Sequence, residues 1–235
     1  MRLIFVRHGE PDYQNDCLTA NGREQAKATA SRLKAEDIKA IYSSPMGRAK
    51  ETASYTAKDH GLDIQVLDFM HEINWGNKSK DVGEAFRIPY EGHPWTLAYR
   101  VITDAAEDAK PVDWENNPFF RDNICMDFYE KISGGFDELL GRYGLARKNG
   151  CYECREENND TIALFAHGGS GAMMYTHLLN LPFPFVLTSM PYGVCSVSII
   201  DFTAQQGELV IPRIELFNDM GHIESYKDEK LHFEK

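Results

Sequence analysis

The sequence predicts an α/β fold with a largely parallel sheet that is covered by helices. Three short apolar segments, rich in β-branched and aromatic residues, alternate with two amphipathic segments in the first third of the chain. Parallel strands need long crossover connections, usually helices, so this alternation is typical of βαβ units. A later apolar run, TIALFA at 161–166, extends the pattern.

The first elements follow in a regular order. Thr19 is a suitable N-cap for the first helix, in which Ala26, Ala30 and Leu33 recur at helical spacing. Pro45 lies where a second helix should begin and Gly61 where it should end. The expected elements are strands at 2–6, 38–44 and 63–69, with helices at 18–36 and 45–61.

Residues 73–125 interrupt this rhythm and contain all three tryptophans, Trp75, Trp95 and Trp114. We interpret them as a lid or inserted subdomain within a single domain spanning 1–235. Tyr90, Trp95, Tyr99 and Trp114 are expected to pack it onto the main domain. Beyond it we expect a helical stretch at 126–150, a loop at 151–160, a strand at 161–169, a helix at 170–180 and two strands around Gly207.

Composition limits the function. The 235 residues carry a net charge of −11, which argues against binding to nucleic acid or to acidic lipid surfaces. No apolar run approaches the roughly 18 residues of a membrane span, and the N-terminal run is too short for a secretory signal. We therefore expect a cytoplasmic protein with no membrane partner.

The five cysteines are expected to be reduced thiols, because their number is odd and no secretory signal is seen. Cys151 and Cys154 form a C-x-x-C pair, but a zinc site would need a second pair, which is missing. We interpret them as two thiols in a polar loop, with a redox or metal role as the alternative.

Two predicted strands end in the same dipeptide, His-Gly. The first ends in Arg7-His8-Gly9 and the later one in His167-Gly168. Ligands of open parallel sheets bind beyond the carboxyl ends of the strands, so these histidines should lie at one edge. Arg48 follows the second strand and Glu72 follows the third, which adds an arginine and a carboxylate to this edge.

These residue types suit phosphoryl transfer. The planar fork of arginine matches phosphate oxygens, and a neutral imidazole can attack phosphorus to form a covalent intermediate. A protonated carboxyl can donate to the leaving oxygen and then activate water. Arginines and a second histidine can neutralise the phosphoryl charge, so no metal or other cofactor is expected.

The motifs around these residues resemble those of the histidine phosphatase superfamily, also called phosphoglycerate mutase-like. The similar segments are RHGE, LTANGREQA, IYSSPMGRAKETA, HEINWG, AHGG and FNDMGHI, in that order. The resemblance covers most of the chain outside 78–150. It implies a three-layer α/β/α sandwich around a mostly parallel sheet with one antiparallel strand.

The resemblance also implies roles. His8 would be the phosphorylated nucleophile, Glu72 the proton donor, and Arg7, Arg48 and His167 the groups that bind the phosphoryl group. Glu10, Asp12 and Glu84 are other carboxylates near the motifs. Gly168 would let a ligand approach the backbone closely.

The chain departs from the family pattern at three places. Pro11 stands where a Ser or Thr is common, and Ala166 stands where a Ser usually precedes the histidine. Gln14 occupies the position of a usual asparagine, with Asn15 next to it, so either amide is a candidate phosphate ligand.

The expected function is a metal-independent phosphomonoesterase that acts on a small phosphorylated metabolite. A phosphoglycerate mutase is the first alternative, and it would need further basic groups in the insertion. A non-catalytic phospho-ligand binder is the second, although all five catalytic groups are present. Cys17 and Arg23 have the spacing of a cysteine phosphatase loop, but their segment is typical of the start of a helix and not of a strand-to-helix loop.

The apolar segment 183–193 could be buried or form a homodimer contact, and the physiological substrate is left open. His93, in the insertion, is a candidate to reach over the site.

Overall fold

The computed structural model describes residues 1–76, 78, 98, 111–121 and 123–223. Its centre is a six-stranded sheet in the order β11-β9-β1-β8-β4-β5. These strands are β1 (Arg2–Arg7), β4 (Ile38–Ser43), β5 (Ile64–Val66), β8 (Thr161–Ala166), β9 (Val197–Asp201) and β11 (Arg213–Asp219). β1, β8, β4 and β5 pair in parallel, whereas β9 runs antiparallel to both of its neighbours. The expected mostly parallel sheet with one antiparallel strand is confirmed.

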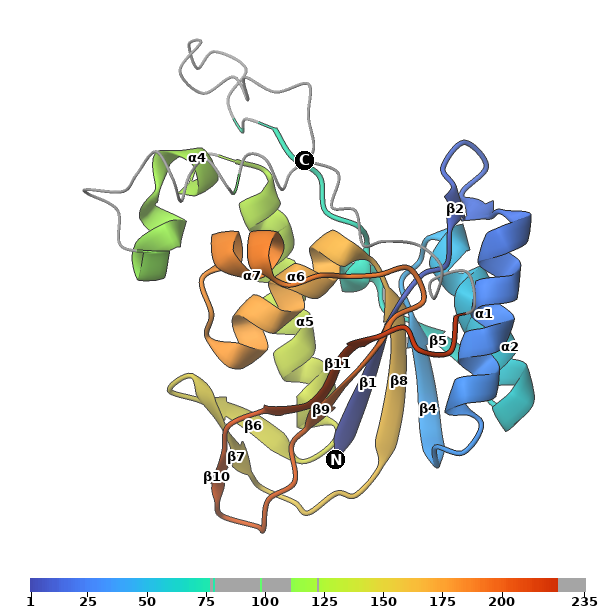
Figure 1. Cartoon of the computed structure of the whole chain (residues 1–235). Helices are drawn as coiled ribbons and strands as arrows, with labels where there is room; N and C mark the ends of the chain where they lie inside the picture. Colours follow the sequence, from blue (N-terminus) through green and yellow to red (C-terminus); the bar gives the residue numbers. More distant parts are fainter. Residues whose placement is uncertain (77, 79–97, 99–110, 122, 224–235) are drawn as a thin grey trace.

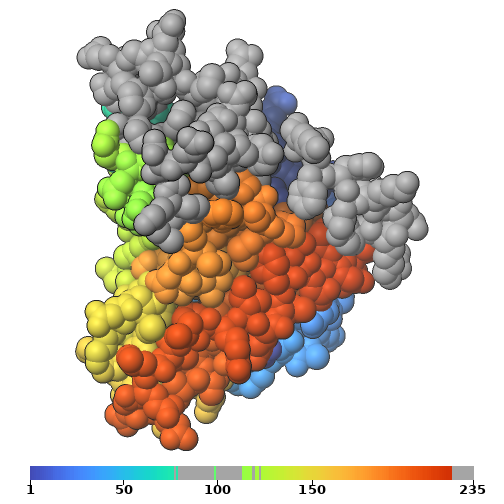
Figure 2. All heavy atoms as spheres, turned by 60° about the vertical axis from the view of Figure 1, so that its left-hand side comes forward, coloured from blue at the N-terminus to red at the C-terminus, as the bar shows by residue number. Residues whose placement is uncertain are grey.

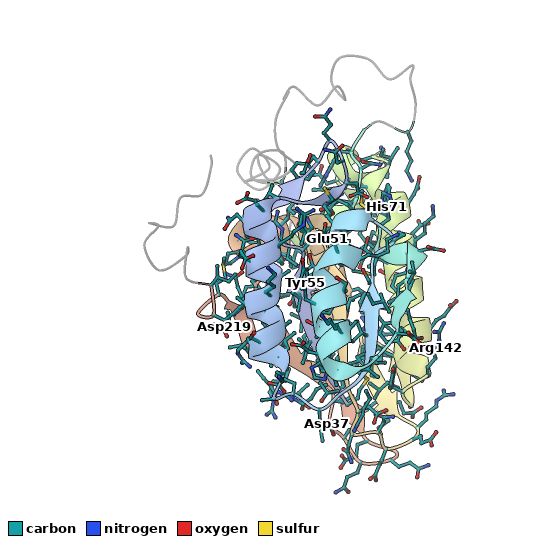
Figure 3. All side chains as sticks on the ribbon, turned by 90° about the vertical axis from the view of Figure 1, so that its right-hand side faces the viewer. Asp37, Glu51, Tyr55, His71, Arg142 and Asp219 are labelled. Carbon is teal, nitrogen blue, oxygen red and sulfur yellow. The ribbon has the colours of Figure 1, made fainter. Side chains whose placement is uncertain are left out.

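Helices cover both faces of this sheet (Figure 1). One layer holds α1 (Ala20–Leu33) and α2 (Gly47–His60), and the other holds α5 (Cys125–Gly141) and α6 (Gly168–Leu179). Figure 3 views the α1–α2 layer, with Glu51 and Tyr55 on α2. The three-layer α/β/α sandwich is therefore present as expected.

The burial of the strands explains why two helical layers are needed. Leu3 and Phe5 of β1 belong to the core beneath α5 and α6, whereas Ile4 and Val6 belong to the core beneath α1 and α2. Successive side chains of a strand point to opposite faces, so an apolar strand buries surface on both sides. All six residues of β8 are buried, as expected for a central parallel strand.

Local signals place the helix ends as expected. The Thr19 side chain accepts a hydrogen bond from the N–H of Gly22 at 3.0 Å and caps α1. Gly61 ends α2 in the left-handed conformation, with φ of 65°.

The segment after α5 differs from the prediction. It forms a second, antiparallel sheet in the order β10-β7-β6, made of β6 (Leu145–Lys148), β7 (Cys151–Cys154) and β10 (Leu209–Val210). The predicted helix over 126–150 was therefore too long and the predicted loop at 151–160 was wrong at its start. The four-residue segments LARK and CYEC are too short for their alternation to reveal a strand. They pair with each other, and β10 pairs with β7 from far along the chain.

Most of the predicted insertion lies outside the described residues, including Glu84, Tyr90, His93, Trp95 and Tyr99. Its described end contains η3 (Pro111–Asn116) and α4 (Pro118–Arg121). Trp114 packs against Phe183, with ring centroids 5.5 Å apart. This contact joins the insertion to α7 (Phe183–Ser189), as expected for Trp114.

α7 lies beside α6, and Figure 2 shows the face on which they meet the C-terminal strands. Phe183, Pro184, Val186 and Leu187 are buried within the chain, so burial explains most of the apolar character of 183–193. A homodimer contact through this segment stays a prediction. None of the described helices is both long and apolar enough to cross a bilayer.

Candidate active site

The carboxyl ends of β1, β8 and β4 bring the predicted residues together. Arg7 pairs with Ala166 in the sheet register, so His8 and His167 follow neighbouring strands at the same level. Their rings lie with centroids 5.1 Å apart, and both residues are almost fully buried. The remaining elements of the site are short: β2 (Pro11–Asp12), β3 (Cys17–Leu18) and the single turn η1 (Asp68–Met70). In Figure 3, His71 marks the end of the molecule near this edge, and Asp37, directly before β4, marks the opposite end.

A backbone contact determines which nitrogen of His8 can react. His8 Nδ1 lies 2.7 Å from the carbonyl oxygen of Gly9, which can only accept a hydrogen bond. Nδ1 must therefore carry the hydrogen, and Nε2 of the neutral ring keeps its lone pair. The N–H of Gly9 donates to Thr52 Oγ1 at 3.1 Å, which holds this turn on α2.

His8 is neutral in this environment. Burial lowers its pKa most, and the Arg7 guanidinium lowers it further, to about 3. The hydrogen bond to the Gly9 carbonyl acts in the opposite direction. The His8 ring is thus neutral at physiological pH, with its lone pair on Nε2.

Ser44 sets the orientation of His167. The Ser44 hydroxyl accepts the N–H of Met46 at 3.2 Å, so its own hydrogen is available for His167 Nε2, 2.7 Å away. When Ser44 donates to Nε2, the hydrogen of the neutral His167 ring is on Nδ1, which is buried and has no protein partner among the described residues. Burial, followed by the nearness of His8, lowers the pKa of His167. In this tautomer the neutral ring has an unpaired N–H that a ligand can accept.

Two arginines supply positive charge. Arg48, the second residue of α2, is only 5% exposed, and its Nε lies 3.4 Å from His8 Nε2. Arg7 Nη1 donates to the carbonyl oxygen of Tyr192, whereas its buried Nε has no partner within the described part of the chain. Both guanidinium groups thus lie near His8 and can offer N–H groups to an anion.

The Glu72 carboxyl lies at the N-terminus of α6, the helix that begins directly after His167. Its Oε1 accepts the N–H groups of Ile73 and Ser170, each at 3.0 Å. Burial raises the pKa of the Glu72 carboxyl, although these N–H groups act to lower it. Since both N–H groups bind Oε1, a proton on the carboxyl belongs on Oε2. Glu72 is therefore suited to hold a proton for transfer.

Gly169 makes room for this carboxyl. A Cβ at position 169 would lie 2.7 Å from Glu72 Oε1 and 2.6 Å from Ile73 Cγ1. Neither distance is tolerated by a side chain, so the second glycine of AHGG lets Glu72 reach the helix. Sequence reasoning missed Gly169, and it also missed Ser44 and Thr52. All three lie inside the quoted motifs, which is the signal that could have identified them.

The loop after β1 differs from expectation in detail. Gln14 and Asn15 are exposed, and the Asn15 amide donates to Asp12 Oδ2 at 2.7 Å. Their roles as phosphate ligands stay predictions. The carboxylate that reaches Arg48 is Asp16, whose Oδ1 lies 2.6 Å from Arg48 Nη1.

The other candidate groups have structural partners or neighbours. Glu10 accepts hydrogen bonds from Thr19 Oγ1 and Asn21 Nδ2, each at 2.7 Å. Asp12 accepts the backbone N–H groups of the 14–15 turn. Gly168 is the buried first residue of α6, and its role in ligand binding stays a prediction. Glu72, by contrast, accepts a hydrogen bond from Ser170 in the first turn of α6, close to His167.

Comparisons with known proteins agree with this geometry. The model of the histidine phosphatase superfamily (branch 1) matches residues 3–91. The probable phosphoglycerate mutase GpmB of Escherichia coli K12 is 36% identical over 157 residues, which cover 62% of this chain and 71% of that protein. A 2,3-bisphosphoglycerate-dependent phosphoglycerate mutase of Thermoplasma acidophilum is 35% identical over 101 residues, which cover 38% of this chain and 50% of that protein.

A solved structure has the same fold. It is a phosphoserine phosphatase mutant of Entamoeba histolytica in complex with phosphoserine, with a TM-score of 0.60 and 20% identity. The match covers 94% of this chain and 98% of that one. The fold match is consistent with the sequence relatives. The 36% identity to the Escherichia coli protein, over 71% of its length, together with the match to the family model, shows that the chain belongs to the histidine phosphatase superfamily.

Proposed function

We propose that the protein is a phosphomonoesterase that hydrolyses a small phosphorylated metabolite through a phosphohistidine intermediate. One observation carries the proposal: the Gly9 carbonyl holds the hydrogen on His8 Nδ1, which leaves Nε2 as a neutral nucleophile beside Arg48. An imidazole in this state can attack phosphorus without first losing a proton.

In the first step, His8 Nε2 attacks the phosphorus and forms a P–N bond while the P–O bond to the substrate breaks. The electron pair of that bond goes to the leaving oxygen, which takes the proton from Glu72. The raised pKa of Glu72 favours the protonated carboxyl that this step requires.

In the second step, water attacks the phosphorus of the phosphohistidine. Glu72, now ionised, takes the proton from the water, and the P–N bond breaks as its electron pair returns to Nε2. Inorganic phosphate leaves, and both His8 and Glu72 regain their starting states.

Arg7, Arg48 and His167 are proposed to bind the phosphoryl oxygens during both steps. Arginine N–H groups and the Nδ1 hydrogen of His167 would offset the charge that builds up on these oxygens. α6 begins directly after His167, and the N-terminus of a helix favours negative charge. With these groups in place, the proposal requires no metal ion.

Phosphoglycerate mutase activity is the second candidate, and it is favoured by the names of the two sequence relatives. The first chemical step would be the same. The two activities differ in the acceptor, because a mutase returns the phosphoryl group to a hydroxyl of the bound product instead of giving it to water.

A panel of phosphate monoesters, including 3-phosphoglycerate, tests the proposal directly. The assays contain a chelator and follow both released phosphate and isomerised product at several pH values. We expect phosphate release without isomerisation. Isomerisation of 3-phosphoglycerate would support the mutase, and loss of all activity in chelator with recovery on adding a divalent ion would contradict the metal-free mechanism.

A further inference from the structure

The loop after β1 places a carboxylate on the phosphate-binding arginine. Asp16 Oδ1 lies 2.6 Å from Arg48 Nη1, and Asp16 Oδ2 accepts the N–H of Gly47 at 2.6 Å. One carboxylate thus binds both the backbone and the side chain at the start of α2. An ionised acceptor makes such hydrogen bonds shorter and stronger than neutral ones.

The backbone is shaped for this contact. Asp16 has φ of 47°, in the left-handed region, which aspartate tolerates better than most residues. A Cβ at position 47 would lie 2.2 Å from the carbonyl oxygen of Asp16, so only glycine allows the loop to approach α2 this closely. The left-handed conformation of Asp16 and the missing side chain of Gly47 together allow this contact.

The contact determines how Arg48 presents its N–H groups. With Nη1 bound to Asp16 and Nε 3.4 Å from His8 Nε2, the edge formed by Nε and Nη2 faces the nucleophile. That edge can bind two oxygens of one phosphoryl group. Arg48 Cζ also lies over the Tyr13 ring, 5.4 Å from the ring centroid. Tyr13 itself is 69% exposed.

Asp16 also compensates a buried charge. The Arg48 side chain is almost fully buried beside His8, which is neutral, and an unpaired charge in such a place is costly. Burial acts to raise the pKa of Asp16, but the Gly47 N–H and the Arg48 guanidinium outweigh it and lower the pKa. The carboxylate is therefore ionised when it faces Arg48.

We propose that Asp16 is a positioning residue, which holds the Arg48 guanidinium with its Nε–Nη2 edge toward the phosphoryl group attacked by His8. This inference rests on the proposed function for the identity of the ligand, a phosphoryl group. It assigns to this loop an indirect role, through Arg48, in addition to the direct amide contact predicted for Gln14 or Asn15.

The test compares Asp16→Asn with a charge-matched control, Asp37→Asn, in the full chain. Both changes remove one aspartate charge, but Asp37 pairs with Lys39 at the opposite end of the molecule. Turnover of an aryl phosphate and inhibition by orthovanadate are measured, with circular dichroism and thermal unfolding to verify folding. For Asp16→Asn we expect kcat/KM to fall between about 10- and 100-fold and the orthovanadate inhibition constant to rise in parallel. Asp37→Asn should stay within about twofold in both.

A double-mutant cycle separates positioning from a general structural effect. Asp16→Asn is introduced into Arg48→Ala, and the affinity for orthovanadate is measured by calorimetry. If Asp16 acts through Arg48, the second change should have little further effect. The same loss of affinity in both backgrounds, or wild-type kinetics and affinity in folded Asp16→Asn, would overturn the inference.

The binding measurement also separates this inference from the proposed function. Should the wild-type protein hydrolyse no phosphate monoester, orthovanadate affinity still reports whether Asp16 shapes the phosphate pocket. A wild-type affinity that depends on Asp16 would support the inference even then, and an affinity independent of Asp16 would contradict it.

Discussion

The two ends of α6 each hold a histidine near an arginine, but they differ in how the polar groups are paired. At the N-terminal end, His167 contacts Ser44 and His8, and its pKa is lowered. At the C-terminal end, His177 Nε2 lies 2.8 Å from Asp137 Oδ1. The first histidine has a hydroxyl partner and the second has a carboxylate.

The C-terminal cluster pairs most of its groups internally. Tyr152 donates to Asp137 at 3.0 Å, and Arg147 donates to the His177 carbonyl at 2.8 Å and to Asn180 Oδ1 at 2.9 Å. Arg147 Nη1 is the exception, because it is buried without a partner among the described residues. These bonds join α5, α6 and the small sheet, and they stabilise the fold because each charged side chain makes at least one hydrogen bond.

The N-terminal cluster instead leaves polar atoms for a ligand. His167 Nδ1 and Arg7 Nε are buried without a partner among the described residues. Buried polar atoms in native proteins are normally hydrogen-bonded. The two ends of α6 differ in the pairing of the histidine: His177 is paired with a carboxylate, whereas His167 Nδ1 and the nearby Arg7 Nε are both unpaired. This difference favours a ligand site at the N-terminal end.

The largest expected effect comes from removing the nucleophile. His8→Ala should lower kcat for a phosphate monoester by more than about 10³-fold, because the proposed mechanism forms the P–N bond on His8. His177→Gln is the control at the other end of α6 and should keep wild-type kcat. Substantial turnover by folded His8→Ala would show that the nucleophile has been misassigned.

Glu72→Gln tests the proton donor. We expect kcat to fall by about 10²-fold or more for alkyl phosphates, whose leaving oxygen needs a proton. Activated aryl phosphates need little help and should lose much less in the first step. Pre-steady-state measurement of alcohol or phenol release compares the two, and an equal loss for both would argue against the acid role.

The pH dependence of stability provides a smaller effect. The pKa of His8 is lowered from 6.5 to about 3, so between these values the unfolded chain binds a proton that the folded protein does not. This contribution to stability is present above pH 6.5 and is lost as the pH falls toward 3. His8→Gln should therefore lose less unfolding free energy than the wild type between pH 7 and pH 4, as measured by urea unfolding. If the free energy of unfolding of both proteins fell equally with pH, His8 would not be neutral and buried as described.

The smallest effect is expected at the paired cluster. Asp137→Asn should lower the free energy of unfolding by about 1–2 kcal/mol, since it weakens hydrogen bonds to a partly exposed charged group. kcat per folded molecule should not change. A fall in kcat without a fall in stability would mean that the two ends of α6 are functionally coupled.

Much of the site could be predicted from the sequence. A strand that ends in RHGE and another that ends in AHGG must meet at one edge if both are parallel and adjacent, and the register of Arg7 with Ala166 confirms that they do. Arg48 and Glu72 are found near them for the same reason. The residues that orient these groups were harder to identify, because Asp16 and Ser44 act through side-chain contacts that periodicity does not describe.

Only one pairing in the small sheet is non-local: β7 pairs with β10, which is more than fifty residues away. β6 and β7 instead form a hairpin across Asn149 and Gly150, which both have positive φ. An Asn-Gly turn is a local hairpin signal, and sequence reasoning missed it. By contrast, β8 is recognisable because burial on both faces demands a continuous apolar run.

The most direct test of the account is to trap the phosphorylated enzyme and locate the phosphoryl group. The protein is mixed with an aryl phosphate, quenched within milliseconds under alkaline conditions that preserve phosphohistidine, digested and analysed by mass spectrometry and ³¹P NMR. We predict a phosphoryl group on Nε2 of His8, with none on His8→Ala. Attachment to another residue, such as Cys17, or turnover with no trapped phosphohistidine at any quench time, would contradict the account.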